Sequence, residues 1–264
     1  MGRHLQFVFH LLWMLPLLPV LYILGKRLRA NFPDLPEPGD TKGVYPGSEN
    51  TGQPLKVLIL GESTMAGVGA RTHEQAFAGT LARQLGESLQ REVQWEVQAQ
   101  SGITLKRLSA EVVSELKTQE VHLVVIGMGA NDAFHLNPPY RWRRHLKMLT
   151  RQLRKRFPEA PVYYCSMPPI KDFTAFSPIM KRIIGAWSRL LGLELQDYVT
   201  REENVYFDNR PIQLERWVSH LPKGGTLQDL FSDGVHPSEA GYQIWAKEMG
   251  RFIMQKTAAV KHML

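Results

Sequence analysis

The sequence predicts an α/β fold in which a parallel sheet is covered by helices on both faces. Short apolar runs typical of buried strands alternate with longer segments of helical spacing, and this alternation continues from residue 55 to residue 254. With 264 residues, of which 44% are hydrophobic, the chain is long enough to bury the core of one large domain. Its single cysteine, Cys165, excludes a disulfide within the chain and argues against a cysteine-based zinc site.

The first half of the predicted sheet lies between residues 55 and 116. Residues 55–60 are a short run of the kind that a buried parallel strand shows, apolar apart from Lys56, and residues 75–90 follow with apolar residues at helical spacing. Apolar and polar residues alternate over 93–98, which predicts a second strand, and residues 105–116 predict a second helix.

The second half repeats the same order. Residues 121–126 predict a third strand, and residues 141–157 a helix with Trp142, Leu146, Leu149 and Leu153 on one face. Residues 161–165 and 204–207 predict the fourth and fifth strands, and residues 238–254 the last helix. The apolar segment 167–198 follows the end of a strand, and we expect either a wall of a substrate pocket or a helix packed on the sheet.

An apolar run, Leu5 to Leu24, precedes the predicted domain. Twenty helical residues at about 1.5 Å each span about 30 Å, the thickness of a bilayer's hydrocarbon core. We therefore predict an uncleaved single-pass membrane anchor; a cleaved signal peptide is the alternative, although no small-x-small cleavage site follows. Because Lys26, Arg27 and Arg29 come after the run, the positive-inside rule favours a cytoplasmic domain, and the periplasmic or extracellular side stays open.

These features divide the chain into four parts. We predict a membrane anchor with its basic flank at 1–30, a linker rich in proline and glycine at 31–54, one domain at 55–256 and a short tail at 257–264. Four of the 32 basic residues lie in the anchor, and the 28 that remain face 25 acidic residues, so the formal net charge of +7 does not indicate nucleic-acid binding.

Eight Lys and Arg residues crowd the predicted helix at 141–156. This basic face is either an ordinary solvated surface or a contact for anionic lipid headgroups beside the anchor. No aromatic stacking platform accompanies the charges, so we do not expect a nucleic-acid partner.

Polar residues that could carry chemistry follow the predicted strands, where sites form in parallel sheets. Ser63 follows the first strand, Gly102 the second and Asn131 the third, while Asp233 and His236 stand before the last helix. Attack by a serine on a carbonyl group needs a base, an acid that orients the base, and donors for the oxyanion. His236 and Asp233 are three residues apart, and the Ser63 N–H, the Gly102 N–H and the Asn131 amide are candidate donors.

Taken together, these blocks resemble the SGNH hydrolase superfamily, the GDSL-type esterases and lipases. The four residues of the family's name correspond to Ser63, Gly102, Asn131 and His236, and Asp233 matches the usual Asp-x-x-His partner. The resemblance covers roughly residues 55–255 and keeps the family's order of blocks. It implies a catalytic triad of Ser63, His236 and Asp233 and an oxyanion hole of Ser63, Gly102 and Asn131.

The resemblance also implies a three-layer α/β/α sandwich with a central parallel sheet, a flavodoxin-like fold, and ester hydrolysis through an acyl-enzyme without metal or cofactor. Glu62 stands where the family name has aspartate, and its side chain is expected to point away from the chemistry. The sequence lacks the Gly-x-Ser-x-Gly elbow of α/β-hydrolases and a complete dinucleotide fingerprint.

We therefore expect a membrane-anchored serine esterase acting on lipid-like or other small acyl esters. Two alternatives stay open: an acetyl esterase or acyltransferase that acts on an envelope glycan, and an anchored interaction protein without catalysis. The fold does not choose among ester substrates.

Overall fold

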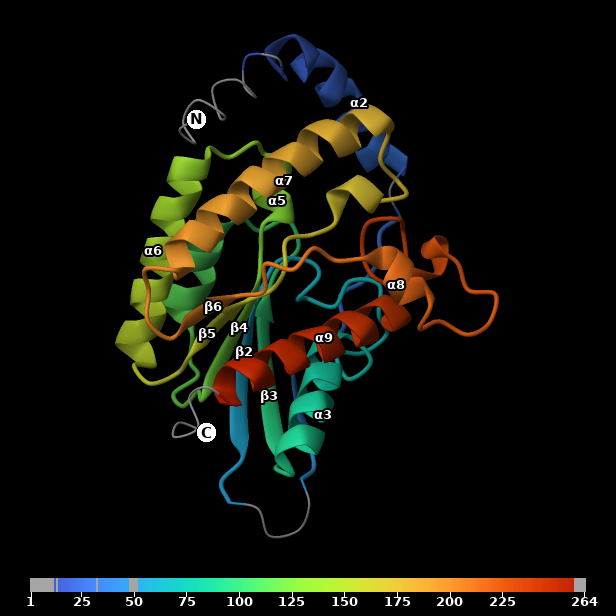
Figure 1. Cartoon of the computed structure of the whole chain (residues 1–264). Helices are drawn as coiled ribbons and strands as arrows, with labels where there is room; N and C mark the ends of the chain where they lie inside the picture. The colour runs from blue at the N-terminus through green and yellow to red at the C-terminus, as the bar shows by residue number, and fades with distance from the viewer. Residues whose placement is uncertain (1–11, 13, 32, 48–51, 259–264) are drawn as a thin grey trace.

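A twisted sheet forms the centre of the molecule (Figure 1). The computed structural model describes residues 12, 14–31, 33–47 and 52–258. In sheet order the strands are β1 (Lys42–Tyr45), β3 (Val93–Ala99), β2 (Leu55–Gly61), β4 (Leu123–Gly127), β5 (Val162–Tyr164) and β6 (Val205–Phe207). Strands β2 to β6 pair in parallel, whereas β1 pairs antiparallel with β3. The predicted α/β fold is confirmed, with a mixed sheet in place of a purely parallel one.

Long helices cover both faces of this sheet and make three layers (Figure 1). Helices α6 (Pro139–Arg156) and α7 (Pro178–Val199) lie on one face, and α3 (Phe77–Leu89) and α9 (Glu239–Ala258) lie on the other. The shorter helices are α4 (Leu105–Arg107), α5 (Ala130–Phe134) and α8 (Leu214–Val218). Single turns of 3-10 helix lie at Leu15–Leu17, Val113–Glu115, Ile170–Asp172 and Leu227–Leu230.

The alternation of side chains along the central strands explains the two cores. Leu58 and Leu60 of β2 pack with α6 and α7, while Val57 and Ile59 pack with α3 and α9. All four are at most 3% exposed. Since neighbouring side chains of a strand point to opposite faces, a strand segment buried on both sides must be apolar throughout, as residues 57–60 are. Lys56, near the start of β2, is only half-buried and pairs with Glu120.

Two predicted segments differ in detail from the structure. The helix predicted at 105–116 begins as α4, widens to a π turn at Leu108–Val112 and tightens to a 3-10 turn at Val113–Glu115. The segment 31–54, predicted as a linker, contributes the edge strand β1, whose residues are exposed or half-buried in alternation. A four-residue strand between prolines and glycines has too short a pattern to be recognised in the sequence.

The N-terminal region includes helix α2 (Leu18–Asn31). Of the predicted span Leu5–Leu24, residues 1–11 and 13 lie outside the described residues. Within the described part of the chain, no helix combines the length and the apolar character that crossing a bilayer requires.

Candidate active site

Ser63 and His236 meet at the carboxyl edge of the sheet although 173 residues separate them. Ser63 follows β2 directly, and His236 lies in the loop before α9. The distance from His236 Nε2 to Ser63 Oγ is 2.9 Å, and the distance from His236 Nδ1 to Asp233 Oδ2 is 2.6 Å. The structure therefore brings together the serine, histidine and aspartate that the sequence predicts.

Asp233 is held by its own loop. Its Oδ1 accepts the backbone N–H groups of Val235 and His236, at 2.9 and 2.7 Å, while Oδ2 faces the imidazole. Burial opposes ionisation, but the hydrogen bonds from the His236 ring and from the two N–H groups outweigh it and hold the pKa of Asp233 below its ordinary value. An ionised carboxylate only accepts hydrogen bonds, so Nδ1 carries the ring proton and Nε2 is left to accept from the serine hydroxyl.

Three contacts tie the histidine loop to the loop that follows Ser63. The Ser232 hydroxyl donates to the carbonyl of Gly69 at 2.9 Å, and the buried Tyr242 hydroxyl donates to the carbonyl of Val68 at 2.7 Å. The Arg71 guanidinium also pairs with Glu239 at the start of α9. These contacts join the carboxyl end of β2 to the start of α9 and so set the distance between serine and imidazole.

The predicted oxyanion residues line the same cavity as Ser63. Gly102 has a φ of +72°, a conformation that side chains rarely adopt, and no heavy atom lies within 4 Å of where its Cβ would stand. The Asn131 Nδ2 donates to the carbonyl of Ile103 at 3.1 Å. The Asn131 side-chain amide also interacts with the buried Glu62 carboxylate, which holds it at the edge of the cavity.

Glu62 is buried against the first turn of α5. Its two carboxylate oxygens accept the backbone N–H groups of Ala130 and Asn131, each at 2.9 Å, and the residue is 3% exposed. Burial raises the pKa of Glu62 to about 7, although the two N–H groups partly offset the effect and the nearby charge of Asp132 adds to it. Glu62 thus holds the backbone of Asn131, a contact that no pattern in the sequence predicts.

Asp132 holds the same loop from the other side. Its Oδ2 accepts the N–H of Leu105 at 2.9 Å and its Oδ1 accepts the side-chain amide of Asn137 at 2.7 Å. Both contacts lie within the protein, so Asp132 has a structural role in this loop.

A cavity of about 1110 Å³ opens beside Ser63. Most of its lining is apolar. The lining residues come from α2 and the stretch after it, from the residues around α5, from the segment before α7, from α7 and α8, and from the loop before α9. Residues 167–198 do both things that were expected. Ile183, Trp187 and Leu191 of α7 are fully buried in the core between this helix and the sheet, while Met180 and Ile184 line the cavity.

The N-terminal lining could not be predicted from the pattern of residues. Leu18, Leu21 and Leu28 of α2 face the cavity, and Pro33 and Leu35 follow them. The carboxylate of Glu37 then accepts the N–H of Ser101 at 3.1 Å, next to Gly102. The apolar run at Leu5–Leu24 indicates that these side chains are buried, but it does not show whether lipid or the rest of the protein covers them.

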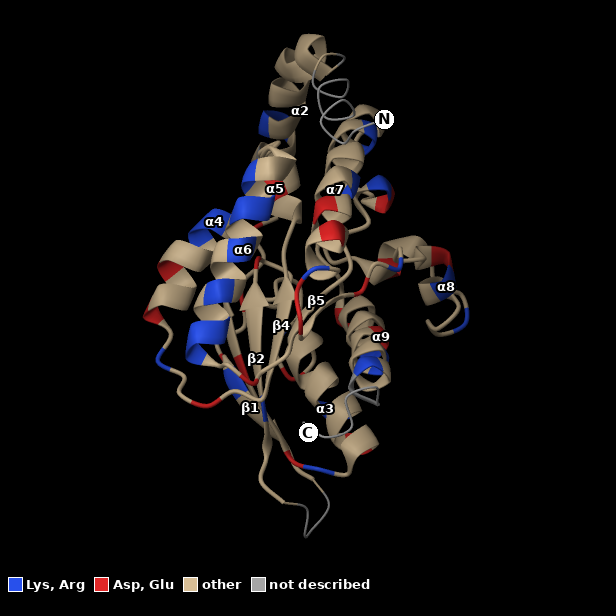
Figure 2. Cartoon of the chain, turned by 60° about the vertical axis from the view of Figure 1, so that its left-hand side comes forward, with Lys and Arg blue, Asp and Glu red and all other residues tan. Residues whose placement is uncertain are grey.

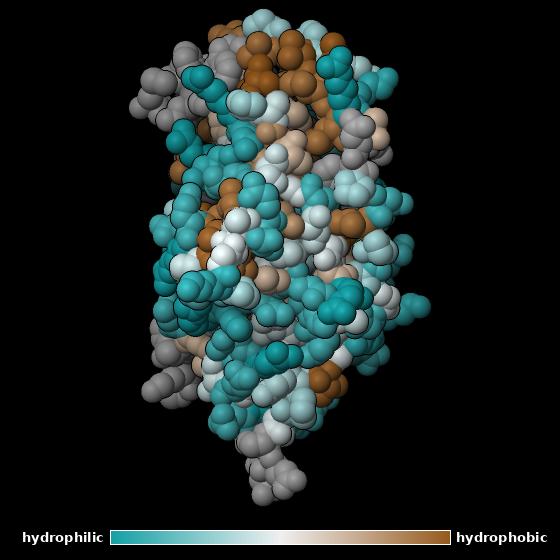
Figure 3. Space-filling model, turned by 90° about the vertical axis from the view of Figure 1, so that its right-hand side faces the viewer, coloured by the Kyte–Doolittle hydropathy of each residue, from teal (hydrophilic) through white to brown (hydrophobic). Residues whose placement is uncertain are grey.

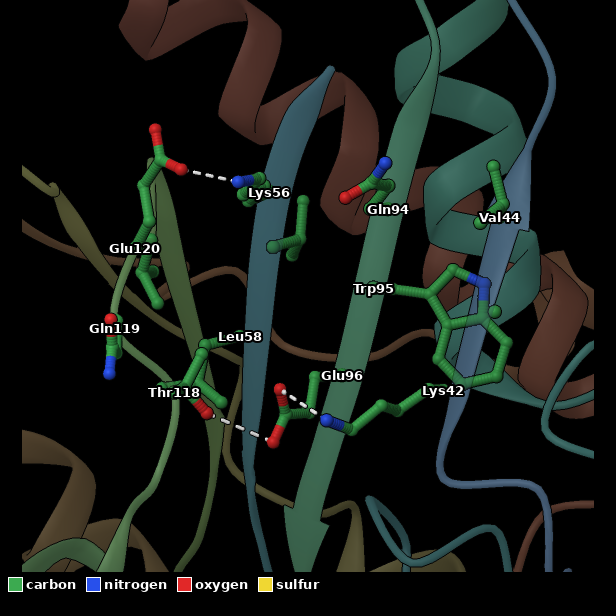
Figure 4. Close-up of a pocket in the computed structure, with 13 residues that line it drawn as sticks. Lys42, Val44, Lys56, Leu58, Gln94, Trp95, Glu96, Thr118, Gln119 and Glu120 are labelled. Atoms are coloured by element: carbon green, nitrogen blue, oxygen red, sulfur yellow. Dashed lines mark hydrogen bonds and ion pairs between the residues drawn. The ribbon is translucent and has the colours of Figure 1, made fainter.

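A second hollow lies at the opposite end of the sheet, near the start of β2 (Figure 4). Its lining carries ion pairs between Lys56 and Glu120 and between Lys42 and Glu96. None of its lining residues is a serine, histidine or cysteine, so it offers no counterpart to the Ser63 site. The buried thiol of Cys165 is a poor nucleophile as well, because burial raises its pKa well above the ordinary value.

The fold and the arrangement of the blocks agree with known hydrolases. The family model of the GDSL-like lipase/acylhydrolase family matches residues 59–244. No relative was found among curated proteins by sequence.

Three solved structures of hydrolases show the same fold. The lipase Lip_vut3 from a goat rumen metagenome is 19% identical, with a TM-score of 0.53 over 74% of this chain and 95% of its own. The extracellular lipase of Streptomyces rimosus is 16% identical, with a TM-score of 0.54 over 75% of this chain and 99% of its own. A family 3 carbohydrate esterase of Clostridium thermocellum is 18% identical, with a TM-score of 0.55 over 79% of this chain and 99% of its own.

At these identities the structures support the fold and not a substrate. The family model, however, spans all the blocks from the end of β2 to the start of α9, and with them Ser63, Gly102, Asn131, Asp233 and His236. The chain belongs to the GDSL-like lipase/acylhydrolase family, the SGNH hydrolases.

Proposed function

We propose that this protein is a serine esterase that hydrolyses carboxylic esters through an acyl-enzyme. The observation that carries the proposal is the chain of two hydrogen bonds from Ser63 Oγ to His236 Nε2 and from His236 Nδ1 to Asp233. The serine hydroxyl points its proton at a base that is already oriented, at the edge of a cavity large enough for a substrate.

In the first half of the reaction, Ser63 Oγ attacks the ester carbonyl carbon and its proton passes to His236 Nε2. The C–O bond to the alcohol then breaks, and the imidazolium gives the same proton to the departing alkoxide. The Asp233 carboxylate stabilises the positive imidazolium between these steps. In the second half, water attacks the acyl-enzyme with His236 again as base, and the acid leaves as Ser63 recovers its proton.

The tetrahedral intermediates carry a negative charge on the former carbonyl oxygen. The Ser63 N–H, the Gly102 N–H and the Asn131 Nδ2 are the proposed donors for it. Such donors act most strongly where water is excluded and where they are held in place before the reaction. The Glu62 carboxylate accepts the backbone N–H of Asn131 and so fixes the residue that carries the proposed donor.

We propose lipid-like or other acyl esters near a membrane as the substrates. The apolar lining of the cavity supports this choice, since buried apolar surface favours an acyl group over a sugar. The alternative is an acetyl esterase or acyltransferase that acts on an envelope glycan. One solved structure of similar fold is an acetyl xylan esterase, at 16% identity, which keeps this alternative open for test.

The membrane itself is proposed as a partner, with the apolar N-terminal segment as its attachment and the domain on the cytoplasmic side. Basic residues after the apolar run support this orientation. The exposed Lys and Arg side chains along α6 are a second proposed contact with anionic lipid (Figure 2).

A chain-length series tests the proposal: the purified full-length protein is assayed on acetyl to dodecanoyl esters, on a lysophospholipid and on an acetylated sugar. We expect hydrolysis of the long acyl esters and almost none by Ser63→Ala. Wild-type activity in Ser63→Ala would overturn the mechanism, and activity confined to the acetylated sugar would select the glycan alternative. An acylated acceptor in place of free acid would identify a transferase.

A further inference from the structure

Helix α2 and Ser63 share one cavity. The lining runs from the Ser63 and His236 loops, past Phe173 and Phe176, to Leu18 and Tyr22 on α2. The N-terminal helix therefore does more than precede the domain, because its side chains close one side of the space in front of the serine.

The residues of α2 that face the cavity form one stripe. Leu18, Leu21, Tyr22, Gly25 and Leu28 recur at spacings of three and four, which places them on a single side of the helix, and Lys26 also lines the cavity beside them. Leu21 and Leu28 also pack against the core that includes α6 and α7. The stripe is thus held against the domain and not only near it.

At the far end of this stripe the cavity opens. Leu18 and Tyr22 line it, yet they are 37% and 68% exposed. Exposed apolar side chains continue around the same helix at Val20 and Ile23, and at Leu15 in the turn before it. Figure 3 shows this apolar surface at the end of the molecule where α2 lies. Exposed apolar patches of this kind are typical of lipid or protein contacts.

The part of the cavity that α7 lines is apolar as well. Phe176, Met180 and Ile184 line it, and Met180 and Ile184 belong to the first two turns of α7. The volume of about 1110 Å³ is slightly above the usual range of ligand pockets and is far more than an acetyl group fills.

We infer that α2 and the start of α7 form the two walls of an acyl-chain channel, which leads from Ser63 to the apolar end of the molecule and selects long-chain acyl esters. This inference rests on the proposed esterase function and names its substrate class. A lipid at a membrane surface would enter its chain between the two helices and present the ester carbonyl to Ser63.

Gly25 provides a direct steric test. It lies within the stripe, and no heavy atom stands within 4 Å of where its Cβ would be, so a phenylalanine side chain enters open space without a clash. Each methylene that leaves water strengthens binding about fourfold, so a channel shortened by a few carbons loses long chains selectively. Ala30→Phe is the matched control, because Ala30 is an exposed residue of α2 that does not line the cavity.

The experiment compares kcat/KM of the full-length protein on p-nitrophenyl acetate and p-nitrophenyl decanoate in one detergent. In Gly25→Phe we expect the ratio of decanoate to acetate activity to fall at least tenfold from the wild-type ratio, while acetate activity stays within threefold. Gly25→Ala and Ala30→Phe are expected to keep the wild-type ratio.

A ratio in Gly25→Phe within threefold of wild type would overturn the channel, as would an equal loss on both esters or the same fall in Ala30→Phe. Ser63→Ala is assayed in parallel. If that variant stayed active, the esterase mechanism itself would fail, whereas an inactive Ser63→Ala with an unchanged Gly25→Phe ratio would refute the channel alone.

Discussion

Glu62→Gln tests whether a buried carboxylate positions the oxyanion loop. The wild-type carboxylate accepts two backbone N–H groups, from Ala130 and Asn131. A glutamine has one acceptor oxygen, so its amide nitrogen must face one of these donors and leave it unpaired. An unpaired buried donor costs about 1–3 kcal/mol, and because the affected backbone carries Asn131, we expect kcat to fall roughly tenfold while KM changes less than about twofold.

The same substitution changes how stability depends on pH. The pKa of Glu62 is raised from 4.5 to about 7, so the folded protein keeps this proton where the unfolded chain has lost it. The stabilising contribution is complete below the unfolded pKa of 4.5 and is lost as pH rises towards 7. A shift of this size corresponds to about 3 kcal/mol in the free energy of unfolding. Glutamine does not titrate, so the stability of Glu62→Gln does not contain this pH-dependent contribution.

Urea unfolding of both proteins at pH 4.5 and pH 8 measures this effect. Relative to wild type, the variant should be less stable at pH 4.5 and should recover by about 3 kcal/mol at pH 8. The exposed Glu37, whose carboxylate accepts the N–H of Ser101, gives a control: Glu37→Gln should leave kcat within about twofold. An equal stability difference at both pH values would show that Glu62 does not titrate as argued.

Three further substitutions address the site and its support. Asn131→Ala should lower kcat about a hundredfold or more by removing one oxyanion donor, with single-turnover acylation as the readout. Asp233→Asn should lower kcat a thousandfold or more, because a carboxamide no longer fixes the histidine tautomer; a fall below tenfold in steady-state assays would contradict this role. Gly61→Ala should lower the free energy of unfolding by about 1–3 kcal/mol, because the added Cβ would lie 2.3 Å from the carbonyl oxygen of Gly127. Urea titration measures this loss. Gly39→Ala is the control in the same titrations, since its added Cβ would meet no atom within 4 Å.

The centre of the fold was predictable because its signals are local. A strand buried on both faces must be apolar throughout, so β2 and β4 are visible as runs of leucine, isoleucine and valine. Parallel strands place their carboxyl ends at one edge, and this geometry alone gathers Ser63, Gly102 and Asn131. The Asp-x-x-His spacing then completes the constellation without any knowledge of tertiary contacts.

The remainder depended on contacts that the sequence does not encode locally. Helix α5 has five residues, too few for a periodic pattern, yet the backbone N–H groups of its first turn donate to Glu62. The apolar residues of α2 are compatible with a lipid environment and with a protein cavity alike. In the structure they line a cavity together with α7, which begins about 160 residues later in the chain, and no local pattern predicts a contact over such a separation.

Fewer than the eight basic residues in the sequence of α6 contribute to its exposed basic face. Arg143 pairs with Glu194 and Asp197, and Arg154 pairs with Glu202, so these charges are partly neutralised within the protein. Five exposed basic residues recur at spacings of three and four and form one stripe: Arg141, Arg144, Lys147, Arg151 and Lys155.

The orientation of α6 decides which of these charges reaches a membrane. Helix α6 begins at the carboxyl edge of the sheet, where α2 and the cavity lie, and runs back towards the amino edge. Arg144 and Lys155 are eleven residues apart, about 16 Å along the helix, or two Debye lengths at physiological salt. If α2 faces the lipid, a charge near Arg144 contributes about 1 kcal/mol to binding of anionic vesicles, and one at Lys155 contributes almost nothing.

Arg144→Gln should therefore weaken binding to anionic vesicles about fivefold and Lys155→Gln less than twofold, with binding to neutral vesicles unchanged in both. Co-sedimentation of the full-length protein measures this. Equal losses in the two variants would mean that α6 lies flat on the membrane, and no loss in either would mean that its charges only solvate the helix. Because both substitutions remove one exposed charge from the same helix, the comparison isolates position along α6 from net charge.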